Sequence, residues 1–210
     1  MIFIIHYAFK DMMASILEVA DLTAQRDIPG LVALLGSPDP DVKGEAAFAL
    51  AEIGSAAIPF LVEAFEQGSN EDRSWIAAVL GQIGDERALD PLIRALREGD
   101  AELRTTAARA LGMIGSEEAV EPLIAALKDA DPFVRSGSVT ALGMLRSRKA
   151  VEALGAATRD EKKPVRMQAV WALVHIGDSA ALPYLEKALQ DPDPDVRRVV
   201  ENAMKRIPRS

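Results

Sequence analysis

DAELRTTAARALGMIGSEEAVEPLIAAL, residues 100–127, is one copy of a pattern that repeats along the 210-residue chain. Each copy contains a basic residue at an equivalent position, and successive basic residues are separated by 30, 31, 31, 31 and 31 residues. These residues are Lys43, Arg73, Arg104, Arg135, Arg166 and Arg197. A fixed period of about 20–50 residues is the signature of a stacked repeat protein. Such chains usually present an extended surface rather than a reaction centre.

Each copy predicts two short antiparallel helices. In the quoted copy, Asp100 is placed to cap a helix whose apolar stripe includes Leu111, and Gly115 is placed to end that helix with a positive φ. A second helix follows at Pro122. We call the helix of the Pro-Leu-Ile type helix A and the helix that carries the basic residue helix B. Helices this short are marginal alone, so stacking has to stabilise them.

The pattern resembles the HEAT-repeat family in its short form of about thirty residues, and most closely the HEAT-like repeats first named for phycobilin lyases. The residues that carry the resemblance are Asp131-Pro-Phe-Val-Arg135, Ala110-Leu-Gly-Met-Ile-Gly115 and Ala119-Val-Glu-Pro-Leu-Ile-Ala-Ala-Leu127, with their copies. The resemblance covers about residues 27–207. It implies an all-α fold: a right-handed α-solenoid, or superhelix, of about six two-helix repeats, with the B helices on the concave face.

The expected domain organisation is an N-terminal capping segment and helix over residues 1–26, followed by a single elongated repeat domain over residues 27–210. Met1–Phe9 is apolar and fits no repeat. It is interpreted as a cap over the exposed end of the stack, because terminal repeats need one. A dimer contact is the alternative, and so is a true start at Met12 or Met13.

Composition excludes several kinds of site. The chain has 24 basic and 32 acidic residues, for a net charge of −8, which disfavours nucleic acid and anionic membranes as partners. It has no cysteine, and its two histidines, His6 and His175, are far apart, so we expect no metal, no cofactor and no catalytic residues. No apolar run is long enough to span a membrane. The expected localisation is cytoplasmic.

The row of basic residues has two interpretations. A line of cations could follow a phosphate backbone. Alternatively, each cation bonds a cap aspartate or a backbone carbonyl of the adjacent unit. The negative net charge and the nearby carboxylates favour the second, structural interpretation.

The fourth unit departs from the pattern. Arg146 replaces the glycine that ends helix B, Ala153 replaces the proline of helix A, and Gly155 lies inside that helix at a cost of about 1 kcal/mol. A basic island results, which consists of Arg146, Arg148, Lys149, Arg159, Lys162 and Lys163. It is interpreted as a solvated junction, with a docking point for an acidic or phosphorylated partner as the alternative.

Four positions of each B helix are predicted to face the groove: one, two, five and nine residues after the basic residue. These columns contain both tryptophans and several methionines, and such residues are enriched in protein interfaces. The alternative is that the two indoles are half-buried packing residues. The candidate partner-binding residues are Phe48, Trp75, Arg109, Met113, Met144, Met167, Trp171 and His175.

These observations favour a non-catalytic protein–protein interaction module or scaffold that binds a protein or peptide on its concave B-helix surface. The resemblance also implies an alternative, a phycobilin-lyase-like enzyme or chromophore chaperone. A nucleic-acid-binding solenoid is a third hypothesis, which the net charge of −8 disfavours. The partner and the oligomeric state stay open.

Overall fold

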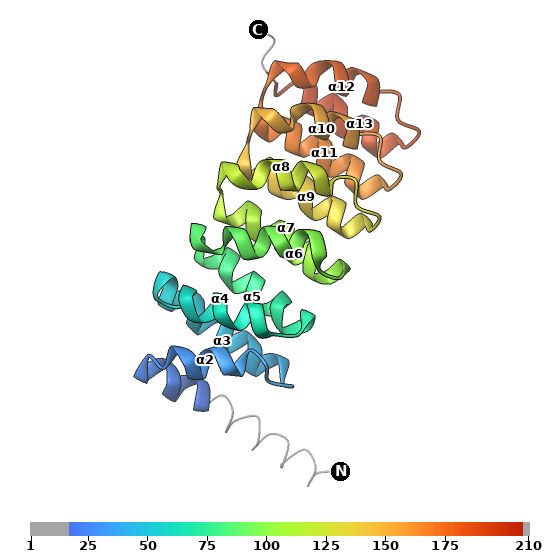
Figure 1. The fold of residues 1–210 in the computed structure, drawn as a ribbon. Coiled ribbons are helices and arrows are strands. Elements are labelled where there is room, and N and C mark those ends of the chain that lie inside the picture. The colour runs from blue at the N-terminus through green and yellow to red at the C-terminus, as the bar shows by residue number, and fades with distance from the viewer. Residues whose placement is uncertain (1–16, 208–210) are drawn as a thin grey trace, which may run out of the picture.

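The computed structural model describes residues 17–207, and within that range the chain forms an all-helical solenoid with no strand (Figure 1). Residues 17–25 are helical, whereas the predicted cap Met1–Phe9 lies outside the described residues. The A helices are α2 (Ile28–Leu34), α4 (Ile58–Gln67), α6 (Leu89–Glu98), α8 (Val120–Ala126), α10 (Val151–Ala157) and α12 (Leu182–Ala188). The B helices are α3 (Pro40–Ile53), α5 (Asn70–Ile83), α7 (Ala101–Ile114), α9 (Pro132–Leu145), α11 (Lys163–Ile176) and α13 (Pro194–Met204).

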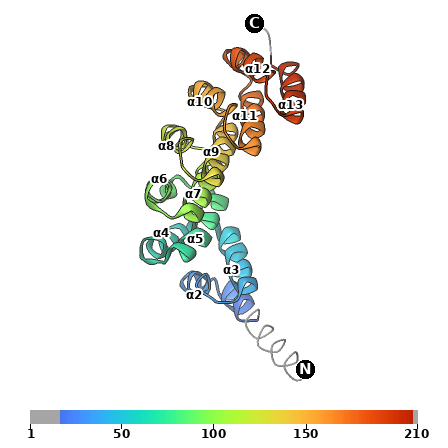
Figure 2. The same cartoon turned by 90° about the vertical axis from the view of Figure 1, so that its right-hand side faces the viewer.

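The helix pairs stack in chain order along one curved axis. Figure 2 shows the A helices on the outer side of the curve and the B helices on the inner side. The six pairs match the predicted number of repeats. Because each pair touches mainly its neighbours, the inner side is one continuous surface built from a single row of B helices.

The predicted caps form as expected in five of the six units. The capping side chains accept hydrogen bonds from backbone N–H groups of the first turn of each B helix, and they are Asp39, Ser69, Asp100, Asp131 and Asp193. In the fifth B helix the cap position is Lys162, which makes no such bond. Each cap provides a partner for a helix N–H that has none inside the helix.

The turn after each B helix explains the one short interval in the repeat. Gly84, Gly115 and Gly177 end their helices in the left-handed region, and Arg146 adopts the same conformation with φ 53°. A short 3₁₀ turn that the sequence did not predict precedes α4, α6, α8, α10 and α12. In the first such turn (Gly54–Ala56), Gly54 itself starts the 3₁₀ segment with φ 73° and ψ −142°, a combination essentially restricted to glycine. This connection absorbs the residue that is missing between Lys43 and Arg73.

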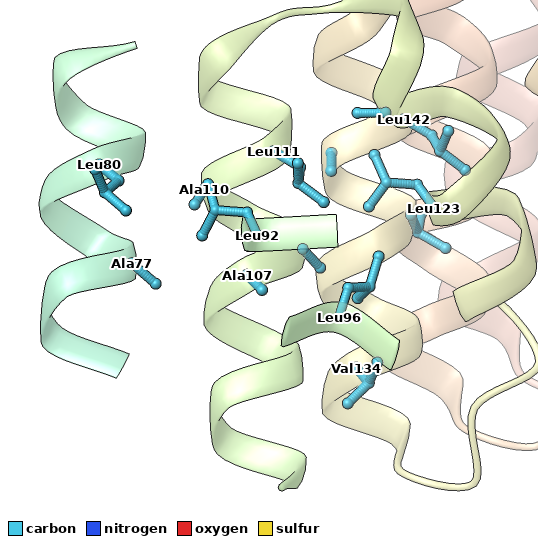
Figure 3. Close-up of a cluster of buried hydrophobic side chains, with 14 of the residues drawn as sticks. Ala77, Leu80, Leu92, Leu96, Ala107, Ala110, Leu111, Leu123, Val134 and Leu142 are labelled. Carbon is cyan, nitrogen blue, oxygen red and sulfur yellow. The ribbon is translucent and has the colours of Figure 1, made fainter. Parts of the chain in front are cut away.

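The core is a layer of aliphatic side chains between the A and B helices. Leu92 and Leu96 of α6 and Leu123 of α8 meet Leu111 and Leu142 of the B helices (Figure 3). All five side chains are buried. The apolar stripe predicted along each B helix therefore faces this layer and leaves the opposite face of the helix for the inner surface.

Neighbouring B helices approach so closely at their middle that only small residues fit. A Cβ atom built on Gly81 would lie 2.7 Å from the Cα atom of Ala110, and one on Gly112 would lie 2.7 Å from the Cα atom of Ala141. The corresponding distance at the next junction, between Gly143 and Ala172, is 3.1 Å. A residue larger than glycine at these positions would force the two helices apart. This glycine–alanine seam therefore sets the spacing of α5, α7, α9 and α11.

We call the repeated basic residues the basic ladder: Lys43, Arg73, Arg104, Arg135, Arg166 and Arg197. In the C-terminal half of the stack, members of this ladder form ion pairs between adjacent units. The guanidinium groups of Arg104, Arg135 and Arg166 each bond both carboxylate oxygens of an aspartate 25 residues later, at 2.7–3.0 Å. The partners are Asp129, Asp160 and Asp191. The same three arginines also donate to backbone carbonyls of the loop that precedes their own helix. The structural interpretation is thus confirmed for these arginines, although the partner lies two residues before the cap position.

The first two units lack this pairing because their neighbouring A helices are longer. Positions equivalent to the paired aspartates hold Gln67 and Glu98, the last residues of the ten-residue helices α4 and α6. Lys43 instead contacts Glu71 at 2.9 Å. Arg73 stacks over the Phe65 ring at 4.8 Å, and its buried Nε has no partner among the described residues.

The glycine inside α10 has a packing role. A Cβ atom on Gly155 would lie 2.3 Å from Cγ of Tyr184, whose ring comes from α12 of the next unit. Gly155, which departs from the repeat pattern, therefore makes room for the bulky Tyr184 of the next A helix, and the two residues pack directly against each other.

Replacing Gly155 with alanine should lower the free energy of unfolding by about 1–3 kcal/mol, because the clash with Tyr184 outweighs the better helix propensity of alanine. In a Tyr184→Ala background the same replacement should be stabilising by up to about 1 kcal/mol. Urea titrations of the four variants measure both effects. The same sign in both backgrounds would contradict the assigned contact.

Asp160→Asn should lower the free energy of unfolding by roughly 3 kcal/mol at pH 7, because it leaves the buried Arg135 guanidinium with only the exposed Glu161 carboxylate as an acidic partner. Burial of the Asp160 carboxyl is the largest single influence and opposes ionisation. The hydrogen bonds from Arg135 and from the Lys162 backbone N–H, together with the charges of Arg135 and Arg166, outweigh it, so the pKa of Asp160 lies below its usual value. Because the folded-state pKa is depressed, this stability is complete above the unfolded pKa of about 3.9 and is lost as pH falls through the folded pKa.

The difference between wild type and Asp160→Asn should therefore shrink below about pH 4 in urea titrations across pH. Glu66→Gln is the matched control, since Glu66 pairs with Arg94 in solvent between adjacent A helices. That replacement should cost less than about 1 kcal/mol. An equal loss of unfolding free energy in the two variants would show that burial does not strengthen the Arg135–Asp160 ion pair.

Candidate functional site

The inner side of the stack exposes the columns that the sequence predicted. The side chains nine residues after the ladder are exposed in all six units: Glu52, Gln82, Met113, Met144, His175 and Arg206. Five residues after the ladder, Phe48, Arg109, Thr140, Trp171 and Asn202 are exposed and Ala78 is half-buried. Positions one and two residues after the ladder are mostly half-buried. Neither tryptophan is sealed in the core, since Trp75 is half-buried and Trp171 is 42% exposed.

Three of the predicted residues gather between α9 and α11. Met144, Trp171 and His175 line a groove of about 230 Å³, which we call the Trp171 groove. Its other lining residues are Thr140, Gly143, Gln168 and Ala172. The floor is the seam contact between Gly143 and Ala172, so the close approach of the two helices leaves the larger side chains as walls. This groove suits an apolar side chain.

Three more predicted residues gather between α5 and α7. Trp75, Arg109 and Met113 line a groove of about 350 Å³, which we call the Trp75 groove. Its other lining residues are Ser74, Ala78, Gln82, Glu102, Thr106 and Ala110. The Ser74 hydroxyl is buried and has no hydrogen-bond partner among the described residues. The Trp75 groove therefore combines an indole wall with several polar groups.

A cation covers each indole from a neighbouring unit. Lys43 Nζ of α3 lies 5.9 Å from the centre of the Trp75 ring, and the Arg206 guanidinium lies 5.8 Å from that of Trp171. Such contacts are worth about 0.5–1 kcal/mol at exposed sites and hold the rings in place. The His175 ring is held as well, since its Nδ1 donates to the Trp171 carbonyl oxygen at 2.8 Å.

Two predicted residues lie apart from both grooves. Phe48 is exposed on α3, and Met167 is half-buried on α11, where it packs against the core. Neither residue is among the lining residues of the Trp75 or Trp171 groove. They flank the candidate surface, and their part in binding stays a prediction.

Two residues at the inner surface, Phe133 and Ser74, are not among the predicted binding residues. Phe133 is 70% exposed and lines a shallow hollow that shares Glu102, Thr106 and Arg109 with the Trp75 groove. The sequence did contain a signal for Phe133, because the equivalent position, two residues before the ladder residue, is acidic in four of the other five units. The role of Ser74 could not be found from the pattern, since its isolation depends on which polar atoms surround it.

The basic island does not form a free cluster of cations. Four of its six members pair with carboxylates: Arg148 with Asp178, Lys149 with Glu117, Lys162 with Glu161, and Lys163 with Asp193 and Asp195. Arg146 donates from Nε to the His175 carbonyl oxygen at 2.8 Å. These contacts favour the interpretation as a solvated junction.

Within residues 17–207, no group of three or more His, Cys, Asp or Glu residues is arranged to hold a metal ion. In the same range, no helix has the length and apolarity needed to cross a bilayer. The inner surface itself offers apolar side chains, hydrogen-bonding groups and charges.

Comparison with known proteins finds one curated relative with a related sequence. The bilin biosynthesis protein RpcF of Synechococcus sp. (strain WH8020) is 35% identical over 75 residues. The match spans 36% of this chain and 36% of that relative, so only about a third of the relative's length is covered.

Solved structures share the fold. A designed armadillo repeat protein in complex with the peptide (KR)4 superposes with a TM-score of 0.60 and 22% identity, over 86% of this chain and 99% of that chain. The complex of CpcE and CpcF of phycocyanin lyase from Nostoc sp. PCC7120 gives a TM-score of 0.58 and 24% identity, over 83% of this chain and 74% of that chain. At these identities the likeness concerns the solenoid alone.

The family of HEAT repeats matches the chain in overlapping segments: residues 14–78, 28–106, 58–142, 90–161 and 120–205. Together these segments cover all of the described helix pairs. The chain therefore belongs to the HEAT repeat family.

Proposed function

We propose that this chain is a non-catalytic interaction module that holds a protein or peptide against its inner B-helix surface. One observation carries the proposal: exposed large apolar side chains concentrate on that surface. Within the described residues they are Leu17, Phe48, Phe60, Met113, Phe133, Met144 and Trp171, and five of these seven belong to B helices. A soluble chain that exposes a run of such residues on one face usually covers that face with a partner.

The composition of the surface supports a protein partner. Aromatic residues, methionine and arginine are enriched at protein interfaces, and both grooves combine them with a few polar groups. The designed armadillo repeat protein in complex with the peptide (KR)4 has the same kind of fold, so a solenoid of this kind can hold a peptide. The net charge of −8 argues against nucleic acid in this place.

Trp171→Ala should reduce recovery of the natural partner, because an anchoring indole in an interface is worth more than about 1 kcal/mol, or roughly fivefold in affinity. Co-precipitation from lysate of the source organism, quantified by mass spectrometry against wild type, measures this loss. Phe60→Ala is the matched control, since Phe60 is 40% exposed but lies on the outer helix α4. Equal recovery by the Trp171 and Phe60 variants, both folded by circular dichroism, would refute the proposed surface.

A second candidate function is bilin binding, as an enzyme or as a chromophore chaperone. It is favoured by the sequence match to RpcF, a protein named for bilin biosynthesis. A tetrapyrrole is a flat conjugated molecule, and the exposed indole of Trp171 offers it a stacking surface.

If the chain binds bilins, adding it to biliverdin should shift and sharpen the visible absorption band and quench the chain's tryptophan fluorescence. Trp171→Ala should weaken both changes, whereas Phe60→Ala should not. Unchanged spectra at micromolar chain and pigment would remove this candidate and leave the protein-binding proposal in place.

A further inference from the structure

Charge changes sign from one end of the inner surface to the other. The exposed column nine residues after the ladder runs Glu52, Gln82, Met113, Met144, His175 and Arg206 from the first unit to the last. Glu45 adds a second exposed carboxylate at the N-terminal end, and Asn202 adds no charge at the other. In this column the row is acidic at one end, uncharged and apolar in the middle, and basic at the other end. Five residues after the ladder, Arg109 adds an exposed cation in the middle, where the exposed Glu102 lines the same groove.

Pairing inside the chain does not cancel this gradient. The Arg206 guanidinium is exposed and lies over the Trp171 ring. Arg146 bonds the His175 backbone carbonyl, which carries no compensating negative charge. A ligand along the surface would therefore be attracted by its basic end to Glu45 and Glu52 and by its acidic end to Arg206.

The two grooves lie between the acidic and the basic end of the row and are separated by two steps of the stack. The Trp75 groove lies between α5 and α7, and the Trp171 groove lies between α9 and α11. Packed helices are about 8–10 Å apart, so the grooves are roughly 16–20 Å apart. An extended chain advances about 3.3 Å per residue, so five or six residues span that separation, roughly.

The Ser74 hydroxyl adds an independent sign of a ligand in the Trp75 groove. Ser74 is 7% exposed, and its Oγ has no hydrogen-bond partner among the described residues. A buried hydroxyl without a hydrogen bond destabilises the chain, so such groups usually pair with an ordered water or with a ligand. A backbone amide of an extended peptide would supply that partner while its side chain contacts Trp75.

We propose that the partner is an extended peptide segment with two bulky apolar anchors about five or six residues apart, one flank basic and the other acidic. This inference rests on the proposed function and specifies its ligand. One anchor occupies the Trp75 groove and the other the Trp171 groove. The basic flank lies over Glu45 and Glu52, and the acidic flank lies near Arg206.

Selection from a phage-displayed library of random peptides of about 16 residues tests this inference, because that length spans the row from Glu52 to Arg206. Enriched peptides should share the two anchors, their spacing and the opposite charges of the flanks. Fluorescence anisotropy then measures the affinity of one labelled enriched peptide for each variant of the full chain.

Trp75→Ala and Trp171→Ala should each weaken binding of that peptide about tenfold or more. Glu52→Lys and Arg206→Glu should each weaken it several-fold, and added salt should reduce the affinity of wild type. Glu121→Lys, an exposed acidic position on the outer helix α8, is the matched control and should have no effect.

Ser74→Ala should change the stability of the chain and its affinity for the peptide in opposite directions. The variant should be more stable than wild type in urea, because an unpaired buried hydroxyl is removed, yet it should bind the peptide about fivefold more weakly. A purely structural serine would move the stability without moving the affinity, and that result would remove Ser74 from the site.

The outcomes separate this inference from the proposed function. Enriched peptides that depend on Trp75 and Trp171 but lack the anchor spacing or the charged flanks would overturn the inference and leave the proposed function standing. Failure to enrich any peptide, with Trp171-dependent recovery of a partner from lysate, would point to a folded partner and overturn the inference alone. Enriched peptides insensitive to every inner-surface variant would overturn both.

Discussion

The structure depends on the contact between a glycine of one B helix and an alanine of the next. No larger side chain fits where a Cβ atom on Gly81 or Gly112 would lie 2.7 Å from the neighbouring backbone. This constraint limits the distance between successive helices from α5 to α11. Because the floor of the inner surface is made of such small residues, the side chains around it define the grooves. The spacing needed for stacking thus also shapes the candidate binding surface.

Two kinds of interaction hold the units together. In the C-terminal half, Arg104, Arg135 and Arg166 bond aspartates in the loop of the following unit. The N-terminal half lacks these pairs, and there Arg73 lies over the ring of Phe65. The difference follows from the length of the A helices, since a seven-residue helix ends early enough for the following turn to present an aspartate. Apolar burial is common to all units, so the ion pairs add to a stack that apolar contacts already define.

The sequence predicts the fold well because each unit repeats the same local signals. Asp131 caps its helix, Gly115 ends one, and the apolar stripe is buried as expected. Features that depend on contacts between units were not predictable from spacing. The partner of Arg135 is Asp160 rather than a cap residue, and Gly155 makes room for Tyr184. For the site, periodicity placed six of the eight chosen residues in two grooves, but it could not reveal the unpaired hydroxyl of Ser74.

The turn at Gly54 has a consequence for how such arrays change in length. One residue fewer in this connection is accommodated by a backbone torsion that glycine alone adopts readily, and α3 still packs against α5. Insertions and deletions are therefore tolerated between helices while the phase of the B helices is preserved. A lineage can accordingly add, lose or recombine units and keep its recognition columns aligned. Specificity then changes by substitution within the columns, and the length of ligand that the surface can contact changes with the number of units.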